Sequence, residues 1–581
     1  MNKTIYDISN ILIIGCGGAG LRAAIEAKHN NLSVKILGKR NKNDAHTILA
    51  AGGINAAFGN LDNEDSWLEH FADTYFEGYE IGDPDLIEYM AKNSPQHVLE
   101  IDKWGANFSK LANGKLNQRY FGAHKYRRTC FSGDYTGQSI LKALLKKVEE
   151  LNIEINDSEY VTDLLVEEGT CFGALSFNIN NGLVTTHLAD AVILCTGGHT
   201  RIWSKSSSRK YENNGDGLYL AFKAGCSLID MEMVQFHPTG MLTPDEIAGT
   251  LVTEAVRGEG GILLNEEGER FMKKYDPERL ELSTRDRVAF ANYTEISNGK
   301  CSPNGGVYLD ISHKSKDFII AKIPKIYRQF IEYQMIDISK EPMEVAPTAH
   351  YSMGGVYVDA FQHSTQINGL YAAGEVSGGL HGANRLGGNS LAEILIFGKA
   401  AGKSASNYSK NLNSVVRSQS VINNAQINLQ KRIKKGDQLS FPLLIKLRQL
   451  MWDYCGVVRN EEKLKRGLDE VKNIKRLLEE VEVIVSDGNY QDLVNIYDLE
   501  ASLFAAESTI LSALYRKESR GSHQRSDFKD LEGSFKFNTL IKNKYGELKC
   551  DQKPFKKMNK NLVDTISSIE RDIDIKNKLL E

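Results

Sequence analysis

The sequence has no long hydrophobic run and no cysteine cluster. Its longest wholly apolar stretches, Ile11–Ile14 and Ala191–Cys195, fall far short of the roughly 18 residues that a membrane-spanning helix needs. The eight cysteines are scattered, with no C-x-x-C motif and no His/Cys group at zinc spacing. We therefore expect no bound metal, no direct membrane insertion and a reducing compartment.

Charge of one sign is also lacking. The chain has 71 Lys and Arg against 75 Asp and Glu, and its formal net charge is −4. Such a balance produces no overall field that would attract nucleic acid, so we expect none to bind. The first ten residues lead directly into the first apolar stretch without the pattern of a secretory signal. The sequence thus predicts a cytoplasmic protein.

Glycine, in contrast, is abundant, with 50 residues against 11 prolines. A G-x-G-x-x-G motif at Gly15, Gly17 and Gly20 lies between a predicted strand at 10–14 and a predicted helix. In this context the backbone N–H groups and the helix dipole can bind a pyrophosphate, so the motif predicts a dinucleotide site. The alternative is an incidental glycine turn. The next strand ends at Lys39, where a Rossmann unit usually has Asp or Glu, and this departure argues against NAD.

The chain length of 581 residues suggests three or four domains. Two further strands, at 191–195 and 369–373, run into glycine turns that suit a flat cofactor. They flank a long insertion. We therefore predict an α/β fold: a discontinuous Rossmann-like domain at 1–236 and 345–415, with an α+β capping domain inserted at 237–344.

Beyond residue 425 the pattern changes to apolar residues at i, i+3 and i+4 between charged ones, which predicts amphipathic helices. We expect a helical domain at 425–535. Residues 536–581 are predicted to form a C-terminal tail, and its lysine-rich stretch at 541–560 is typical of a solvated or disordered end. A docking role is the alternative for this tail.

Polar clusters beside glycine mark the middle of the chain. Each His or Arg in them has a structural explanation, such as a capped loop or a surface ion pair. Together they suit a small dianion, because Arg binds carboxylates in pairs of hydrogen bonds and His can donate another. With no Ser/His/Asp elbow and no HExxH motif, hydrolysis has little support. The clusters contain His237, Thr253, Glu254, Arg257, Arg285, His350 and Arg385.

The same segments carry a family resemblance. The chain resembles the flavoprotein subunits of succinate dehydrogenase and fumarate reductase, and the resemblance extends to about residue 530. L-aspartate oxidase, which has a similar fold, is the alternative. The segments concerned are Gly15–Gly20, His46-Thr47, 50–54, 118–122, 237–240, 257–261, 350–355, 381–391 and 518–527.

The resemblance implies FAD as cofactor and assigns roles by position. His46 matches a histidine attached covalently to the flavin 8α-methyl group. Arg285 matches the arginine that moves the proton, with Glu254 and Arg257 as its relay. Phe121, His237, Thr253, His350 and Arg385 match substrate-binding positions. The remaining implied FAD contacts are Gly15, Gly17, Gly18, Ala19, Gly20, Lys39, Thr47, Gly52, Gly53, Asp216, Glu375, Ser390 and Leu391.

Two positions separate the candidate activities. His46 is usually absent from aspartate oxidases, which also have Glu where this chain has Phe121. Ala51 departs from the Gln that is usual in the succinate and fumarate branch. A non-catalytic FAD-binding module is a further alternative, but it would be expected to have lost Arg285, His350 or Arg385.

The resemblance also implies partners. Electrons from succinate would leave through an iron–sulfur subunit toward quinone, because this chain has no cysteine cluster of its own. A membrane anchor subunit would then hold the protein at the cytoplasmic face of the inner membrane.

Overall fold

A computed structural model describes residues 4–544 and 546–567. Over these residues, its largest sheet has the strand order β6–β2–β1–β9–β8–β7, and β16 pairs with β9 as well. Strands β6, β2, β1, β9 and β16 run parallel, whereas β7 and β8 are antiparallel additions. The strands are β1 (Thr4–Ile14), β2 (Val34–Gly38), β6 (Glu154–Asp157), β7 (Glu159–Glu167), β8 (Thr170–Asn178), β9 (Val184–Leu194) and β16 (Leu370–Ala372).

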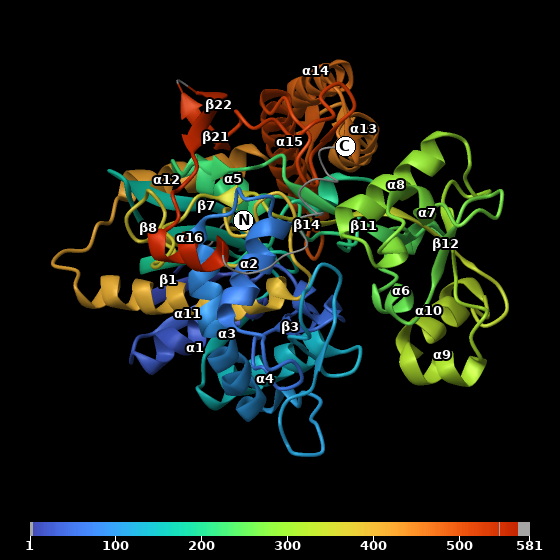
Figure 1. Ribbon diagram of the computed structural model, residues 1–581. Coiled ribbons are helices and arrows are strands. Elements are labelled where there is room, and N and C mark those ends of the chain that lie inside the picture. Colours follow the sequence, from blue (N-terminus) through green and yellow to red (C-terminus); the bar gives the residue numbers. More distant parts are fainter. Residues whose placement is uncertain (1–3, 545, 568–581) are drawn as a thin grey trace.

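Helices cover one face of the parallel part of this sheet (Figure 1). Their apolar side chains form one core with those of β1, β2 and β9. Helix α1 follows β1 directly, which gives the β–turn–helix unit that the glycine motif predicts. The covering helices are α1 (Gly18–His29), α3 (Pro84–Ile101), α4 (Thr136–Glu150) and α11 (Asn389–Lys410).

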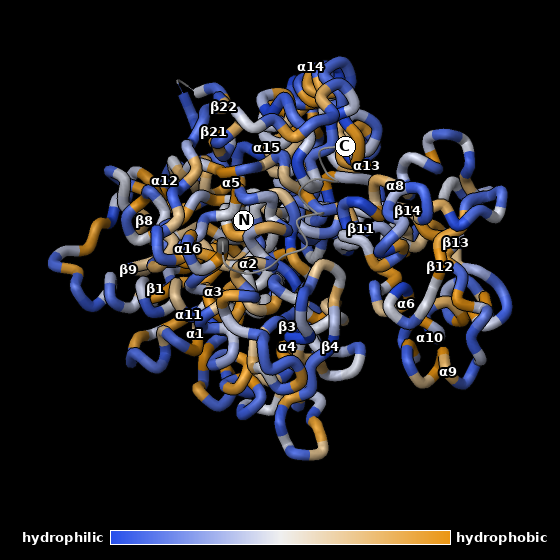
Figure 2. Tube along the Cα trace, viewed as in Figure 1, coloured by the Kyte–Doolittle hydropathy of each residue, from blue (hydrophilic) through white to orange (hydrophobic). Residues whose placement is uncertain are grey.

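The inserted segment forms a cap at one side of the molecule (Figure 1). Its antiparallel sheet has the order β11–β14–β13–β12 and encloses a separate apolar core, visible as orange segments along β12 and β13 in Figure 2. The strands are β11 (Val234–Met241), β12 (Ile262–Leu264), β13 (Val307–Asp310) and β14 (Met343–Ser352). The helices are α6 (Ala255–Gly258), α7 (Met272–Tyr275), α8 (Arg285–Ser297), α9 (Lys316–Lys322) and α10 (Pro324–Gln334).

Strands β11 and β14 connect this cap to the nucleotide-binding part. The predicted boundaries at 236/237 and 344/345 fall inside these two strands. The cause is physical: β11 and β14 pair along most of their length, so they carry the chain continuously from one part to the other.

The C-terminal region begins with a helix bundle. Long helix α15 (Gln491–Tyr515) packs against α13 (Ser440–Tyr454) and α14 (Glu461–Leu477), and α12 (Gln419–Lys431) lies beside them on β7 and β8. Helix α15 also contacts α5 (Asp216–Lys223), which belongs to the nucleotide-binding part. The predicted fold class, a Rossmann-like domain with a cap and a helical C-terminal region, is confirmed.

The lysine-rich tail differs from its prediction. Residues Phe537–Lys544 and Glu547–Pro554 form a hairpin, β21–β22, and β21 pairs with β10 (Leu228–Ile229) in the body of the protein. The alternative of a disordered end is therefore wrong for this segment, whereas the solvated surface agrees with the largely exposed or half-buried side chains from Lys542 onward. The hairpin is anchored by the run from Phe537 to Ile541, which is buried. A short helix, α16 (Lys560–Ser567), follows, and residues 568–581 lie outside the described part.

Candidate active site

A cavity of about 750 Å³ lies between the β1–α1 turn, the start of α11 and the cap. Its wall includes all of the residues predicted for cofactor binding, substrate binding and catalysis except Gly20 and Arg257. Segments far apart in the sequence thus meet in one place. Its size is within the range that ligand-binding sites usually have.

Gly20 does not line the cavity but packs against the Gly15–Gly20 turn. A Cβ atom there would lie 1.9 Å from the carbonyl oxygen of Gly15, so only glycine allows the helix to approach the turn. Gly15 itself has φ +116°, and a Cβ atom on it would lie 2.0 Å from the oxygen of Cys195. These two glycines bring β1, α1 and β9 close together beneath the cavity.

The wall around this turn fits a dinucleotide. Helix α1 begins here, and its N-cap residue, Gly17, has no side chain to cover the helix end. Thr196, just beyond the end of β9, also lines the cavity. The N–H groups of the first helical turn are suitable donors for phosphate oxygens.

Lys39 has carboxylates as neighbours. Its Nζ lies 2.6 Å from Asp498 Oδ1 of α15 and 3.4 Å from Asp216 Oδ2 of α5. Burial opposes the charge of Lys39, but the two carboxylates raise the pKa of its ammonium group above the usual value. The C-terminal bundle therefore reaches the end of β2, where the sequence departs from the usual acidic residue.

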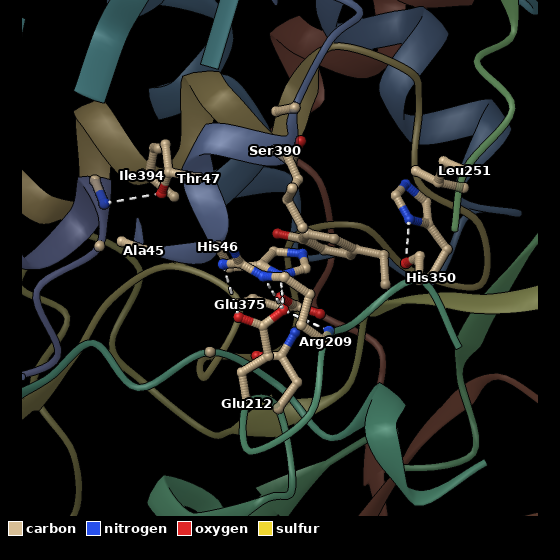
Figure 3. A pocket seen from close by; sticks show the side chains of 18 of the residues that line it. Ala45, His46, Thr47, Arg209, Glu212, Leu251, His350, Glu375, Ser390 and Ile394 are labelled. Atoms are coloured by element: carbon tan, nitrogen blue, oxygen red, sulfur yellow. Dashed lines mark hydrogen bonds and ion pairs between the residues drawn. The ribbon is translucent and has the colours of Figure 1, made fainter. Parts of the chain in front are cut away.

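His46 lies in a short turn, His46–Leu49, held against the start of α1. The hydroxyl of Thr47 accepts a hydrogen bond from the Gly18 N–H at 3.0 Å, and His46 Nδ1 lies 2.9 Å from Glu212 Oε1 (Figure 3). Burial lowers the pKa of His46, but the Glu212 carboxylate outweighs burial and raises it above the usual value. The cation of this pair is thus stabilised.

The two other histidines of the site behave in the opposite way. His237 on β11 and His350 on β14 have ring centroids 5.4 Å apart, and His350 Nδ1 lies 3.0 Å from the Ser207 hydroxyl. Burial, and then Arg285 for His237 and Arg385 for His350, hold both pKa values well below the usual one. Both rings are therefore neutral and can each donate one hydrogen bond.

Arg285 stands beside these rings at the start of α8. Its Nε donates to Glu254 Oε2 at 2.9 Å, and the backbone N–H of Gly122 donates to Glu254 Oε1 at 2.9 Å. Burial raises the pKa of Glu254, but Arg285 and Arg257 outweigh it and lower the pKa below the usual range. Glu254 is therefore an anion between two arginines.

Arg257 lies behind the cavity wall rather than in it. Its Nη2 is 3.8 Å from Glu254 Oε2, and its Nη1 donates to the carbonyl oxygen of Glu281 at 2.6 Å. Glu254, at the N-terminal end of α6, lines the cavity. Arg257, three residues later, contacts Glu254 from the interior of the cap. The i,i+3 pairing expected from the sequence is present.

Phe121 also lines the cavity, beside the Gly52-Gly53 turn. A Cβ atom on Gly52 would lie 2.4 Å from the Phe121 ring, so the absence of a side chain at Gly52 makes room for the ring. Ala51 lies in the same wall, and its carbonyl oxygen accepts a hydrogen bond from Arg119 at 3.4 Å.

Gln235 is a contact that the sequence prediction missed. Its side-chain oxygen accepts from Arg285 Nη1 at 3.2 Å and from Arg385 Nη2 at 3.1 Å. Its amide nitrogen donates to the carbonyl oxygen of Arg385 at 2.9 Å, which fixes the orientation of the amide. Gln235 precedes His237 by two residues, so strand alternation could have placed both side chains on one face.

Glu375 and Arg385 complete the wall. Burial, opposed by His46, raises the pKa of Glu375 to about 7, and its Oε1 accepts from the Ser352 N–H at 3.0 Å. Burial, and then Arg285, lower the pKa of Arg385 to about 10. Arg385 remains charged at neutral pH.

Comparisons with known proteins agree with this arrangement. Residues 10–391 match the model of the FAD binding domain, and residues 445–569 match that of the fumarate reductase flavoprotein C-terminal region. A fumarate reductase (CoM/CoB) subunit of Methanothermobacter marburgensis is 43% identical over 547 residues, which cover 94% of this chain and 98% of the relative. The chain belongs to the succinate dehydrogenase and fumarate reductase flavoprotein family.

Other members of the flavoprotein family support the assignment. The succinate dehydrogenase flavoprotein subunit of Rickettsia felis is 35% identical over 97% of this chain and 98% of its own length. A solved structure of E. coli quinol fumarate reductase FrdA has a TM-score of 0.90 at 32% identity, covering 95% of this chain and 98% of that one. These names favour the succinate and fumarate branch over the aspartate oxidase alternative, and the predicted cofactor, FAD, is confirmed.

Among residues 4–544 and 546–567, no helix has the length and apolar character needed to cross a membrane. The same residues contain no group of three or more His, Cys, Asp or Glu side chains placed to bind a metal ion.

Proposed function

We propose that this chain interconverts succinate and fumarate as the flavoprotein subunit of a larger complex. One observation supports the proposal above all: Arg285, paired with Glu254, faces the same cavity as His237, His350 and Arg385. A proton carrier and three donors for carboxylates therefore share one site. This set matches a four-carbon dicarboxylate better than it matches a neutral substrate.

The donors hold the substrate by its two ends. Arg385 keeps its charge and has a rigid fork of N–H groups, so it can bind one carboxylate with two hydrogen bonds. His237 and His350 are neutral and donate without adding charge to a site that already contains two arginines. We assign the second carboxylate to His237 and Thr253. Fixing both ends lowers the entropic part of the barrier.

Arg285 moves the proton. In the direction of fumarate reduction, its guanidinium donates a proton to the substrate carbon, and Glu254 keeps the group oriented from 2.9 Å away. In succinate oxidation the neutral guanidine is a strong base, which suits the very weak C–H acid. Arg257 is the next charged group behind Glu254, so we propose the order Arg285, Glu254, Arg257 for the return of the proton.

The cofactor residues lie around the remaining wall. When bound, FAD supplies the acceptor or donor of the hydride. We propose that the Gly15–Gly20 turn holds the pyrophosphate, that Lys39 and Asp216 lie at the adenosine end, and that Glu375, Ser390 and Leu391 contact the flavin. We also propose that His46 forms a covalent bond to the flavin 8α-methyl group.

The proposed partners are an iron–sulfur protein of the same complex and, through it, an electron carrier. Related proteins support a complex of several chains by their names, which include "quinol fumarate reductase" and "flavoprotein subunit". The names of the relatives also contain two kinds of carrier, a quinol and the CoM/CoB pair. We propose quinone, with partner subunits that hold the chain at the cytoplasmic face of the inner membrane. Co-purification followed by electron-transfer assays with a quinone and with the CoM/CoB pair distinguishes the two carriers.

A dye assay tests the reaction itself. The purified chain loaded with FAD should reduce a dye with succinate but not with L-aspartate, and Arg285→Ala should abolish this activity while the protein stays yellow. Peroxide formation with L-aspartate would replace the proposed activity by that of an aspartate oxidase. Dye reduction by Arg285→Ala at the rate of the unchanged protein would exclude the proton role.

A further inference from the structure

Glu212 is a buried carboxylate in the cavity wall that the proposed reaction does not use. Its side chain is 7% exposed and lies 2.9 Å from His46 Nδ1, whereas the His46 side chain is 32% exposed and faces the cavity (Figure 3). His46 Nε2 has no hydrogen-bond partner among the described residues. The two ring nitrogens therefore differ: Nδ1 is bound and Nε2 is open to the cavity.

Arg209 holds Glu212 in place. The backbone N–H of Arg209 donates to Glu212 Oε1 at 2.6 Å, and its Nη2 donates to Oε2 at 3.1 Å. Arg209 is in turn fixed by Asp44, which lies in the loop just before His46. Glu212 thus accepts hydrogen bonds from both the backbone and the guanidinium of Arg209, and Asp44 holds that guanidinium.

An ionised carboxylate can only accept hydrogen bonds. Arg209 and His46 keep Glu212 ionised, since they lower its pKa below the usual range although burial opposes them. The atom of His46 that faces Glu212 must therefore carry a hydrogen. Nδ1 keeps this hydrogen in both charge states of the ring, and on neutralisation the proton leaves from Nε2.

We infer that Glu212 is a positioning residue that selects the tautomer of the neutral His46 ring and thereby presents the Nε2 lone pair to the cofactor cavity. The inference deepens the proposed flavin attachment at His46 and rests on it. Glu375 and Arg209 also act electrostatically on the His46 ring, and His46 acts on His350. Of these residues and Glu212, only Glu212 has a hydrogen bond to the His46 ring.

The attachment of the flavin to His46 Nε2 is an oxidation, and its atoms and electrons balance when fumarate is the oxidant. A bond forms between Nε2 and the flavin 8α carbon, and one C–H bond of the methyl group breaks. His46 gives up its Nδ1 hydrogen as a proton toward Glu212, and the methyl hydrogen also leaves as a proton. The two electrons released by forming the bond, with these two protons, convert one fumarate to succinate.

The first measurement is covalent flavin on the full-length chain. The chain is supplied with FAD and fumarate, denatured in acid, and analysed for fluorescence on the chain and for the mass of the His46 peptide. Glu212→Gln should lower the rate of attachment by about 10² or more, as expected when a histidine adopts the wrong tautomer. Glu212→Asp should recover part of the rate. Glu462→Gln, an exposed carboxyl on α14, is the matched control and should not change it.

The second measurement reads the tautomer directly. Nitrogen-15 NMR of histidine-labelled full-length protein, with His46→Asn to assign the signal, follows both ring nitrogens while the pH is raised. We expect Nδ1 to keep its hydrogen in the unchanged protein, and a mixture of tautomers in Glu212→Gln.

The outcomes separate the two proposals. Attachment in Glu212→Gln at the unchanged rate would overturn the inference, and so would loss of the Nδ1 hydrogen on neutralisation. If the unchanged protein carries no covalent flavin, the attachment proposed under function is wrong. The NMR result then decides the role of Glu212 by itself.

Discussion

The two ends of the cavity shift the pKa of histidine in opposite directions. At the substrate end, His237 and His350 lie near Arg285 and Arg385, and their pKa values fall well below the usual one. At the other end, His46 pairs with Glu212 and its pKa rises. Burial acts in the same direction on all three rings, so the charge of the nearest neighbour decides the result. The site thus keeps neutral donors where the dianion binds and a stabilised cation at His46.

The largest expected effect is that of removing the cation at the substrate end. Arg285→Ala should lower kcat for succinate by about 10³ or more, because the proton carrier and its charge are both lost. Steady-state dye reduction measures this, with bound flavin checked by absorbance. Arg476→Ala, an exposed position on α14, provides the matched control. A kcat within a few-fold of the original would show that Arg285 is not the proton carrier.

Removing the anion between the arginines should have the next largest effect on kcat. Glu254→Gln leaves Arg285 and Arg257 without their shared carboxylate, so we expect kcat to fall by about 10² while KM changes less. The matched control is Glu246→Gln in the same wall of the cavity. If KM rises and kcat does not fall, Glu254 serves binding rather than the proton.

Gln235 tests whether the two arginines need a shared acceptor. Replacing it by Met removes the oxygen that accepts from both Arg285 and Arg385, and each lost hydrogen bond to a charged group costs about 1.5–3 kcal/mol. We expect a roughly 10²- to 10⁴-fold loss in kcat/KM if the two losses add, which steady-state assays measure. Gln235→Glu should recover part of it. An unchanged kcat/KM in the Met variant would mean that Arg285 and Arg385 are held by other contacts.

The pH dependence of substrate binding sharpens the contrast in charge. Because the pKa values of His237 and His350 are lowered, both rings stay neutral above their lowered values, and a shift of several-fold in Kd is not expected between about pH 6 and 8. Quenching of flavin fluorescence by a non-reacting dicarboxylate measures this. Affinity that falls steeply as pH rises through about 6.5 would show that a charged histidine binds the dianion.

The smallest effect concerns stability at the His46 end. The raised pKa of His46 means that its pairing stabilises the fold fully below about pH 6.5 and is lost as pH rises through the folded value. The lowered pKa of Glu212 means that its share is present above about pH 4.5 and is lost on acidification. The Tm difference between the unchanged protein and Glu212→Gln should therefore be largest at about pH 5–6 and shrink above it. A difference that grows toward pH 8 would contradict the pairing.

The sequence alone pointed to most of the predicted residues that line this cavity, because the signals for them are local. The glycine motif sits between a strand and a helix, and each substrate candidate stands beside glycine in a short segment. Glu212 carried no such signal: its partner, His46, is 166 residues away, and only folding brings them together. Arg209 and Asp498 were missed for the same reason. Gln235 could have been found from strand alternation with His237.

The fold followed the same rule. Apolar stretches that run into glycine turns predicted strands of the parallel sheet, and periodicity predicted the helix bundle, but neither showed which strands connect the cap to the nucleotide-binding part. Strands β11 and β14 pass through the predicted boundaries because they pair with each other. The C-terminal hairpin was concealed by its many lysines, although its first strand carries the buried residues Leu540 and Ile541.

This hairpin has a consequence for the order in which the protein is made. Asn538 donates to Asp230 at 2.6 Å, and the hydroxyl of Thr539 donates to Glu232 at 2.7 Å, so the last strands supply partners for buried carboxylates near the middle of the chain. Burying such groups without partners is costly. The region around β10 can therefore reach its final packing only after the strand at Phe537–Lys544 has been synthesised.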